Sequence, residues 1–189
     1  MNNERRILIL LRHAKSSWKN EAIDDFDRPL AKRGKQDAQK VGFWLKRSNL
    51  IPDLILSSPA KRARKTATIV SRELALDENQ IRWMPEIYDA SPANLLKVLK
   101  RCPEQAKQVL LVGHNPGMEF LLEYLCRKPV PMPEDGKLLT TACVAIIEYT
   151  KNWNNLAESV AELISITRPI EMEYSRANSA LARQSMSPE

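Results

Sequence analysis

Three short apolar runs constrain the fold of this 189-residue chain more than any other feature. They are ILILL at 7–11, DLILS at 53–57 and VLLV at 109–112. Runs of this length are typical of strands buried on both faces, as in parallel sheets. Stretches with helical periodicity separate them. The chain therefore predicts alternating strands and helices in a doubly wound α/β sheet with right-handed crossovers.

Further elements extend this pattern. The expected helices cover residues 34–48, 59–75, 92–101 and 116–126, and further β-rich stretches occupy 80–83, 141–149 and 160–167. We therefore expect three α/β/α layers, with a mostly parallel sheet flanked by helices. Residues 1–168 are long enough for one domain, and the polar stretch 169–189 is expected to be a flexible tail.

Composition narrows the function classes. A formal charge of +6 favours anionic partners without choosing among phosphorylated protein, small phosphoester and nucleic acid. No segment approaches the roughly 20 apolar residues that a membrane-spanning helix needs. The apolar run at 7–11 is too short for a signal-peptide core. Three cysteines without CxxC spacing favour a reducing cytoplasm over a disulfide framework or a zinc site.

Polar residues follow each apolar run at once. The segments are RHA at 12–14, SPAKR at 58–62 and GHNPG at 113–117, and they contain the only two histidines, His13 and His114. Ligands of open parallel sheets bind beyond the carboxyl ends of the strands. We therefore expect these side chains to meet at one edge of the sheet.

The second and third segments share a pattern typical of helix starts. Each places an N-cap candidate, Ser58 or Asn115, directly before a proline that fits the first helical position. A helix start points unpaired N–H groups and the positive end of its dipole toward the crevice, which favours an anion. Arg62, in the first turn of its helix, can add a fork of donors to a phosphate.

A phosphate at this edge gives the histidines a chemical role. Only a neutral imidazole attacks phosphorus, and desolvation together with nearby arginines lowers the pKa of His13 toward that form. Attack would give a phosphohistidine and split one displacement into two. Arg12, Arg62 and His114 would surround the transferred phosphoryl oxygens. The sequence has no Walker-type glycine loop and no cluster of metal ligands, so we expect no metal or other cofactor.

The leaving group needs a proton, which a nearby carboxylic acid could supply. Glu86, which follows the β-like run at 80–83, is the first choice, and the weaker candidates are Asp24, Asp25 and Asp27. Glu86 could instead be a solvated loop carboxylate. Ser16 could contact the phosphate through its hydroxyl or cap a turn.

Five motifs in chain order resemble those of the histidine phosphatase superfamily. The first, Leu11-Arg12-His13-Ala14, is similar to the RHG signature with Ala14 in place of glycine. The others are Asp27-Arg28-Pro29-Leu30, Ser58 to Thr66, Pro85-Glu86-Ile87-Tyr88 and Gly113-His114-Asn115-Pro116. The resemblance covers residues 7 to about 126 and implies a phosphoglycerate mutase-like fold.

Within the superfamily, the short chain and the segments RHAKSSW and DRPL are most similar to phosphohistidine phosphatases of the SixA type. The resemblance implies that His13 is the nucleophile and that Arg12, Arg62 and His114 form the phosphate pocket. It places Glu86 at the position of the proton donor, where SixA-type proteins vary. It also implies a phosphoric monoester hydrolase-like activity on phosphohistidine in a protein, with inorganic phosphate as the product.

Other functions remain open at this point. A phosphatase or mutase for a small phosphoester would use the same residues, although no long basic insertion is present to hold a second anion. A non-catalytic phosphate-binding module would have no need of a nucleophilic histidine. The basic run at 61–65 could contact nucleic acid, but no aromatic residue interleaves it, so we expect neither nucleic acid nor membrane as a partner.

Overall fold

The computed structural model describes residues 5–18 and 22–172. A six-stranded sheet with the order β3-β2-β4-β1-β5-β6 forms its centre. The strands are β1 (Arg6–Arg12), β2 (Leu54–Ser57), β3 (Ile81–Trp83), β4 (Gln108–Gly113), β5 (Val144–Tyr149) and β6 (Glu162–Thr167). Strands β3, β2, β4 and β1 pair in parallel, whereas β5 and β6 are antiparallel additions beside β1. The predicted mostly parallel sheet is confirmed.

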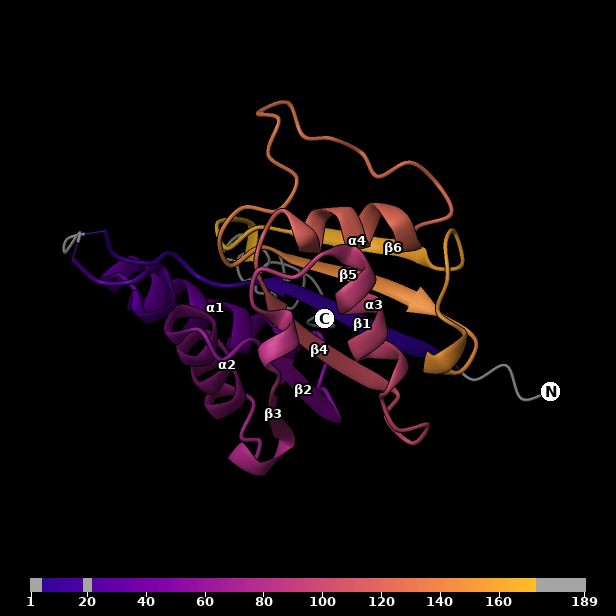
Figure 1. Ribbon diagram of the computed structural model, residues 1–189, viewed down its shortest axis with the longest axis horizontal. Coiled ribbons are helices and arrows are strands. Elements are labelled where there is room, and N and C mark those ends of the chain that lie inside the picture. The colour runs from indigo at the N-terminus through magenta and orange to yellow at the C-terminus, as the bar shows by residue number, and fades with distance from the viewer. Residues whose placement is uncertain (1–4, 19–21, 173–189) are drawn as a thin grey trace, which may run out of the picture.

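Four helices cover the two faces of this sheet. They are α1 (Lys32–Arg47), α2 (Lys61–Glu73), α3 (Pro92–Lys100) and α4 (Gly117–Leu125). Helices α1 and α2 lie together on one side of the sheet, and α3 and α4 lie on the other (Figure 1). The three-layer α/β/α architecture expected from the sequence is therefore present.

Alternate residues of the buried strands serve the two helix layers. In β1, Ile9 belongs to the core under α1 and α2, and its neighbour Leu10 belongs to the core under α3 and α4. Both side chains are fully buried. Because successive strand side chains point to opposite faces, a strand covered on both sides must be apolar throughout. That requirement explains the continuous apolar runs.

The helix starts differ from the prediction. Helix α2 has Ala60 as N-cap and α4 has Pro116, and neither helix has a side-chain cap. The predicted caps have other partners, since Ser58 Oγ accepts from the Ala60 N–H at 3.2 Å and Asn115 Nδ2 donates to the Leu139 carbonyl at 3.0 Å. The N-cap prediction is wrong because the turns after β2 and β4 continue past their prolines before the helices begin.

The predicted tail is only partly within the described residues. Of 169–189, residues 169–172 are described, and Met172 is buried in the core under α1 and α2. The remainder lies outside the described residues. Among the helices of the described chain, none has the length and apolar character required to cross a bilayer.

Candidate active site

The carboxyl ends of β1, β2 and β4 bring the predicted site together. His13 follows β1 and His114 follows β4, and the two imidazole centroids lie 5.0 Å apart. The His13 N–H donates to the Gly113 carbonyl at 3.0 Å, which extends the pairing of the two strands past their ends. Parallel neighbouring strands end at the same edge, so residues about a hundred positions apart in sequence become adjacent.

The imidazole of His13 is held between two hydrogen bonds. Its Nδ1 lies 2.8 Å from the Ala14 carbonyl oxygen, and its Nε2 lies 3.2 Å from Arg62 Nε. An arginine only donates and a carbonyl only accepts. Nδ1 therefore carries the proton, and the lone pair of Nε2 faces Arg62. This is the tautomer that leaves Nε2 as a nucleophile.

The surroundings of His13 keep it neutral. Burial is the main cause that lowers its pKa to about 4, and the charges of Arg62, Arg12 and Arg28 act in the same direction. The hydrogen bond to the Ala14 carbonyl opposes them. At neutral pH the ring is therefore almost entirely unprotonated, as attack on phosphorus requires.

His114 is neutral for similar reasons. Burial, followed by the neighbouring His13 and Arg62, lowers its pKa to about 3. Its Nε2 lies 2.8 Å from Ser58 Oγ, while its buried Nδ1 has no hydrogen-bond partner among the described residues. When the Ser58 hydroxyl donates to Nε2, Nδ1 carries the ring proton. His114 then has one unused donor, at a nitrogen that is buried in the free protein.

Arg12 is anchored to the loop that precedes β5. Its Nη1 donates to the Leu139 carbonyl at 2.7 Å, and its buried Nε has no partner in the described chain. Burial lowers the pKa of Arg12 against the opposing charge of Glu119, yet a guanidinium remains protonated in proteins. Arg12 thus keeps its charge and an unused donor beside the histidines.

Arg62 is held by a carboxylate from a distant segment. Its Nη2 lies 2.8 Å from Asp25 Oδ2, and its Nη1 donates to the Asp25 carbonyl oxygen. Tyr88 also donates to Asp25 Oδ2, at 3.1 Å. Burial raises the pKa of Asp25, but the hydrogen bonds from Arg62 and Tyr88 outweigh it and the net pKa is lowered. Asp25 is therefore an ionised carboxylate on the arginine fork.

Arg62, His114 and Asp25 line a small, mainly polar pocket of about 300 Å³, whereas His13 and Arg12 are not among its lining residues. Its lining residues are Asp25, Arg62, Tyr88, Asp89, His114 and Asn115. Within the described part of the chain, no group of three histidine, cysteine, aspartate or glutamate side chains could hold a metal ion. The ligand that best matches this donor set is an oxyanion, because guanidinium and imidazole N–H groups converge on it.

Glu86 and Ser16 have partners elsewhere. Glu86 lies in a short 3₁₀ turn (Pro85–Ile87), is almost half exposed, and binds Arg101 Nη2 at 2.9 Å. Hydrogen bonds to the backbone and to Arg101 lower its pKa. The buried hydroxyl of Ser16 accepts from Arg28 Nη2. Neither residue lines the pocket that contains Arg62 and His114.

The sequence predictions gave too little weight to three residues, Asp25, Arg28 and Tyr88. Asp25 ranked behind Glu86, and neither Arg28 nor Tyr88 had a role. Arg28 is buried, and its Nη1 lies 2.6 Å from Asp25 Oδ1, while its guanidinium carbon lies 3.2 Å from the centroid of the Trp18 ring. The signal was available, because Arg28 and Tyr88 both belong to segments that resemble superfamily motifs.

Comparison with known proteins shows a similarity to one superfamily. A family model for the histidine phosphatase superfamily, branch 1, matches residues 8–88. A structure named as a candidate phosphohistidine phosphatase SixA from Nakamurella multipartitia superposes with a TM-score of 0.77 at 27% identity, covering 90% of this chain and 99% of that one. The chain is therefore similar to the histidine phosphatase superfamily in sequence over residues 8–88 and in fold over most of its length. A second such candidate, from Agrobacterium tumefaciens, superposes on this chain with a TM-score of 0.69 at 29% identity, covering 87% and 98% of the two chains.

Relatives in sequence support the same family. An uncharacterised Mycobacterium tuberculosis protein is 27% identical over 163 residues, which cover 84% of this chain and 99% of the relative. An uncharacterised chloroplast protein of Arabidopsis thaliana is 37% identical over 60% of this chain, which spans 56% of the plant protein. A 2,3-bisphosphoglycerate-dependent phosphoglycerate mutase from Bifidobacterium longum is 38% identical over 80 residues, 41% of this chain and 30% of the mutase.

Proposed function

We propose that this protein is a phosphatase in which His13 is the nucleophile, and that its substrate is phosphohistidine carried by a protein. The observation that carries the proposal is the orientation of His13. The Ala14 carbonyl holds the proton on Nδ1, and Nε2 faces the Arg62 guanidinium at 3.2 Å. A phosphate bound to Arg62 would then lie in front of the nucleophilic nitrogen.

In the first step, Nε2 of His13 attacks phosphorus and a P–N bond forms as the bond to the leaving group breaks. Arg12, Arg62 and His114 donate to the equatorial oxygens, where charge spreads in the transition state. The electron pair of the broken bond leaves with the departing imidazole, which takes up a proton. The enzyme is left with a phosphohistidine at residue 13.

In the second step, water attacks the phosphorus of this intermediate. The P–N bond to His13 breaks, inorganic phosphate leaves, and Nε2 regains its lone pair. The water gives up one proton as it attacks, and this proton replaces the one that the departing imidazole took up in the first step. The two steps together consume one water and release a neutral imidazole and hydrogen phosphate. Neither step requires a metal ion, which agrees with a donor set made of guanidinium and imidazole groups.

The choice of phosphohistidine rests on the leaving group. An alkyl phosphate needs a positioned acid, because an alkoxide is a poor leaving group, whereas an imidazole is protonated easily near neutral pH. Glu86, the expected donor, is paired with Arg101, and Asp25 is ionised on Arg62. A site whose carboxylates are both held in the charged form suits a phosphoramidate better than an alkyl phosphate. Likeness to the candidate SixA structures supports the same choice.

For an alkyl phosphate, which needs a donor, Asp25 or Glu86 would first have to leave its arginine partner. When phosphate binds the Arg62 fork, the Asp25 carboxylate loses its ion pair, and an anionic neighbour raises its pKa. Glu86 would have to leave Arg101 and move into the pocket. We therefore keep Glu86 as a candidate and place Asp25 ahead of it.

The state of the three cysteines supports a cytoplasmic location for the protein. Cys102, Cys126 and Cys143 are all buried and unpaired. Burial raises the pKa of each thiol to about 11, so none is a reactive thiolate. Unpaired thiols persist in reducing compartments, which agrees with a cytoplasmic protein.

A small phosphoester is the second candidate substrate, and the observation that favours it is the similarity to a phosphoglycerate mutase over 80 residues. A mutase must also hold a second anion close to the first. A screen of sugar phosphates, phosphoglycerates and nucleotides decides between the two substrate classes. Turnover of one of them at a kcat/KM above that for phosphohistidine would replace our proposal.

The main experiment mixes the protein with a phosphotransfer domain that carries phosphohistidine. We expect the wild-type protein to remove the phosphate and His13→Ala to leave it in place. Rapid quenching should trap an acid-labile phosphoryl group on the wild-type protein. Equal loss of phosphate with both proteins would rule out the proposal. Tight phosphate binding without turnover of any phosphoester would instead indicate a binding module.

A further inference from the structure

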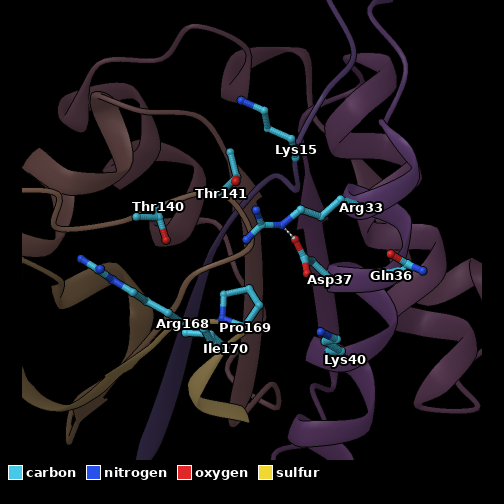
Figure 2. A pocket seen from close by; sticks show the side chains of 10 residues that line it. All are labelled: Lys15, Arg33, Gln36, Asp37, Lys40, Thr140, Thr141, Arg168, Pro169 and Ile170. Carbon is cyan, nitrogen blue, oxygen red and sulfur yellow. Dashed lines mark ion pairs between the residues drawn. The ribbon is translucent and has the colours of Figure 1, made fainter. Parts of the chain in front are cut away.

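A second, larger cleft lies at the same edge of the sheet as the histidines. It has a volume of about 660 Å³ and lies between α1, the loop before β5 and the end of β6 (Figure 2). Four basic side chains and a single acidic one contribute to its lining; they are Lys15, Arg33, Lys40, Arg168 and Asp37. The pocket that contains Arg62 and His114 shares none of these residues.

The two pockets flank one short segment. Lys15 lies two residues after His13, and its carbonyl oxygen accepts from the Ala31 N–H at 2.9 Å. On the other wall, the Ala142 N–H donates to the His13 carbonyl at 3.3 Å, directly after Thr141, which lines the cleft. A part of the substrate bound in the cleft would therefore lie close to the part bound at His13.

Two of the four basic side chains in the cleft form ion pairs with carboxylates. Both terminal nitrogens of Arg168 bind Asp135 at 2.8 Å, and Arg33 Nε lies 3.5 Å from Asp37. These two arginines are balanced by carboxylates. Lys15 is exposed and has no ion-pair partner in the part of the chain that the structure describes, so its charge is available to a ligand.

We infer that this cleft binds an acidic segment of the protein that carries the phosphorylated side chain, an inference that rests on the proposed function. The cationic groups stand apart around the cleft instead of converging on one point (Figure 2). Such spacing matches several carboxylates along a peptide better than one phosphate. Pro169 and Ile170 add apolar surface for a peptide backbone, and among residues 5–18 and 22–172 no aromatic side chain lines the cleft to stack on nucleic-acid bases.

The experiment compares two phosphohistidine peptides that differ only beside the phosphorylated residue, where one carries four glutamates and the other four glutamines. Wild-type protein should give a lower KM for the glutamate peptide. Lys15→Gln combined with Lys40→Gln should raise that KM about three- to tenfold, as two solvated ion pairs would allow. The KM of the glutamine peptide and the turnover of an aryl phosphate should not change. The preference should fall in 0.5 M salt.

The matched control is Lys35→Gln combined with Lys46→Gln. These lysines also lie on α1 and are exposed, but they do not line the cleft. The control removes the same net charge and should leave the KM of the glutamate peptide unchanged. An equal rise in KM for both double variants would assign the effect to overall charge and overturn the inference.

Direct binding separates this inference from the proposed function. An unphosphorylated, fluorescently labelled glutamate peptide is titrated with wild-type protein and both double variants. Weaker binding by the cleft variant alone supports the inference even if no phosphohistidine peptide is turned over. Equal binding by all three proteins contradicts it even if phosphohistidine is hydrolysed. Tighter binding of a single-stranded oligonucleotide than of the glutamate peptide would assign the cleft to nucleic acid instead.

Discussion

Arg62 Nε donates a hydrogen bond to His13 Nε2 at 3.2 Å, while the terminal nitrogens of the same guanidinium bind Asp25. One side chain thus orients His13, the proposed nucleophile, and offers the fork that a phosphate would occupy. In the free protein a carboxylate lies on that fork. Binding of phosphate and release of Asp25 are consequently coupled.

Replacing Arg62 should abolish most activity. We expect Arg62→Ala to lower kcat/KM for an aryl phosphate by roughly 100- to 1000-fold, because both the orientation of His13 and transition-state donors are lost. Arg62→Lys should recover little, since an ammonium cannot reproduce the planar fork. Steady-state kinetics measure both. Lys65→Ala, an exposed change on the same helix, is the control, and an equal loss there would contradict the role of Arg62.

Asp25 should compete with phosphate. Asp25→Asn removes the negative charge on Arg62, so we expect inorganic phosphate to bind several-fold more tightly, as titration calorimetry can measure. The neighbouring Asp24→Asn, which changes an exposed side chain, should leave the affinity unchanged. Weaker phosphate binding by Asp25→Asn would show that the carboxylate organises the pocket more than it competes.

Leaving-group dependence should identify the proton donor. A general acid matters most for substrates whose leaving groups have a high pKa. We expect Asp25→Asn to slow an alkyl phosphate about 10- to 100-fold more than a nitrophenyl phosphate, and Glu86→Gln to slow both equally little. Comparison of kcat/KM for the two esters provides the measurement. A selective loss with Glu86→Gln would restore Glu86 as the donor.

The buried histidines should make folding sensitive to acid. Their pKa values are lowered by burial to about 4 for His13 and about 3 for His114, so the unfolded chain binds more protons once the pH falls below about 6.5. Stability is then lost as the pH falls toward 4, by up to about 1.4 kcal/mol per pH unit for each histidine. Urea unfolding at pH 7 and 4.5 should show a smaller loss for His13→Asn combined with His114→Asn. An identical loss would contradict this assignment.

Gly34 should be required for the turn that follows His13. A Cβ at this position would lie 2.1 Å from the Lys15 carbonyl oxygen. Gly34→Ala should therefore push the backbone at Gly34 away from the backbone at Lys15 and lower the free energy of unfolding by about 1–3 kcal/mol. We expect kcat to fall as well, because the turn positions His13. Gly136→Ala is the control. No atom lies within 4 Å of its added Cβ, so its positive φ costs stability without affecting kcat.

The sequence was most informative where burial is complete. Strands covered on both faces must be apolar, and ligands of parallel sheets lie beyond the strand ends, so the convergence of His13 and His114 followed from the positions of the runs. The partner of Arg62 could not be predicted, because Asp25 comes from a segment without periodicity. The ion pair of Glu86 with Arg101 also depends on tertiary packing. Local patterns describe a residue's own element, and these partners come from other elements.

The group that orients His13 is a main-chain carbonyl, that of Ala14. Many nucleophile–base pairs depend on a carboxylate for this task, and a single substitution can delete it. Here any residue at position 14 supplies the same oxygen, provided that its side chain fits the fully buried space. A substitution of the residue after His13 can therefore leave the alignment of the ring intact.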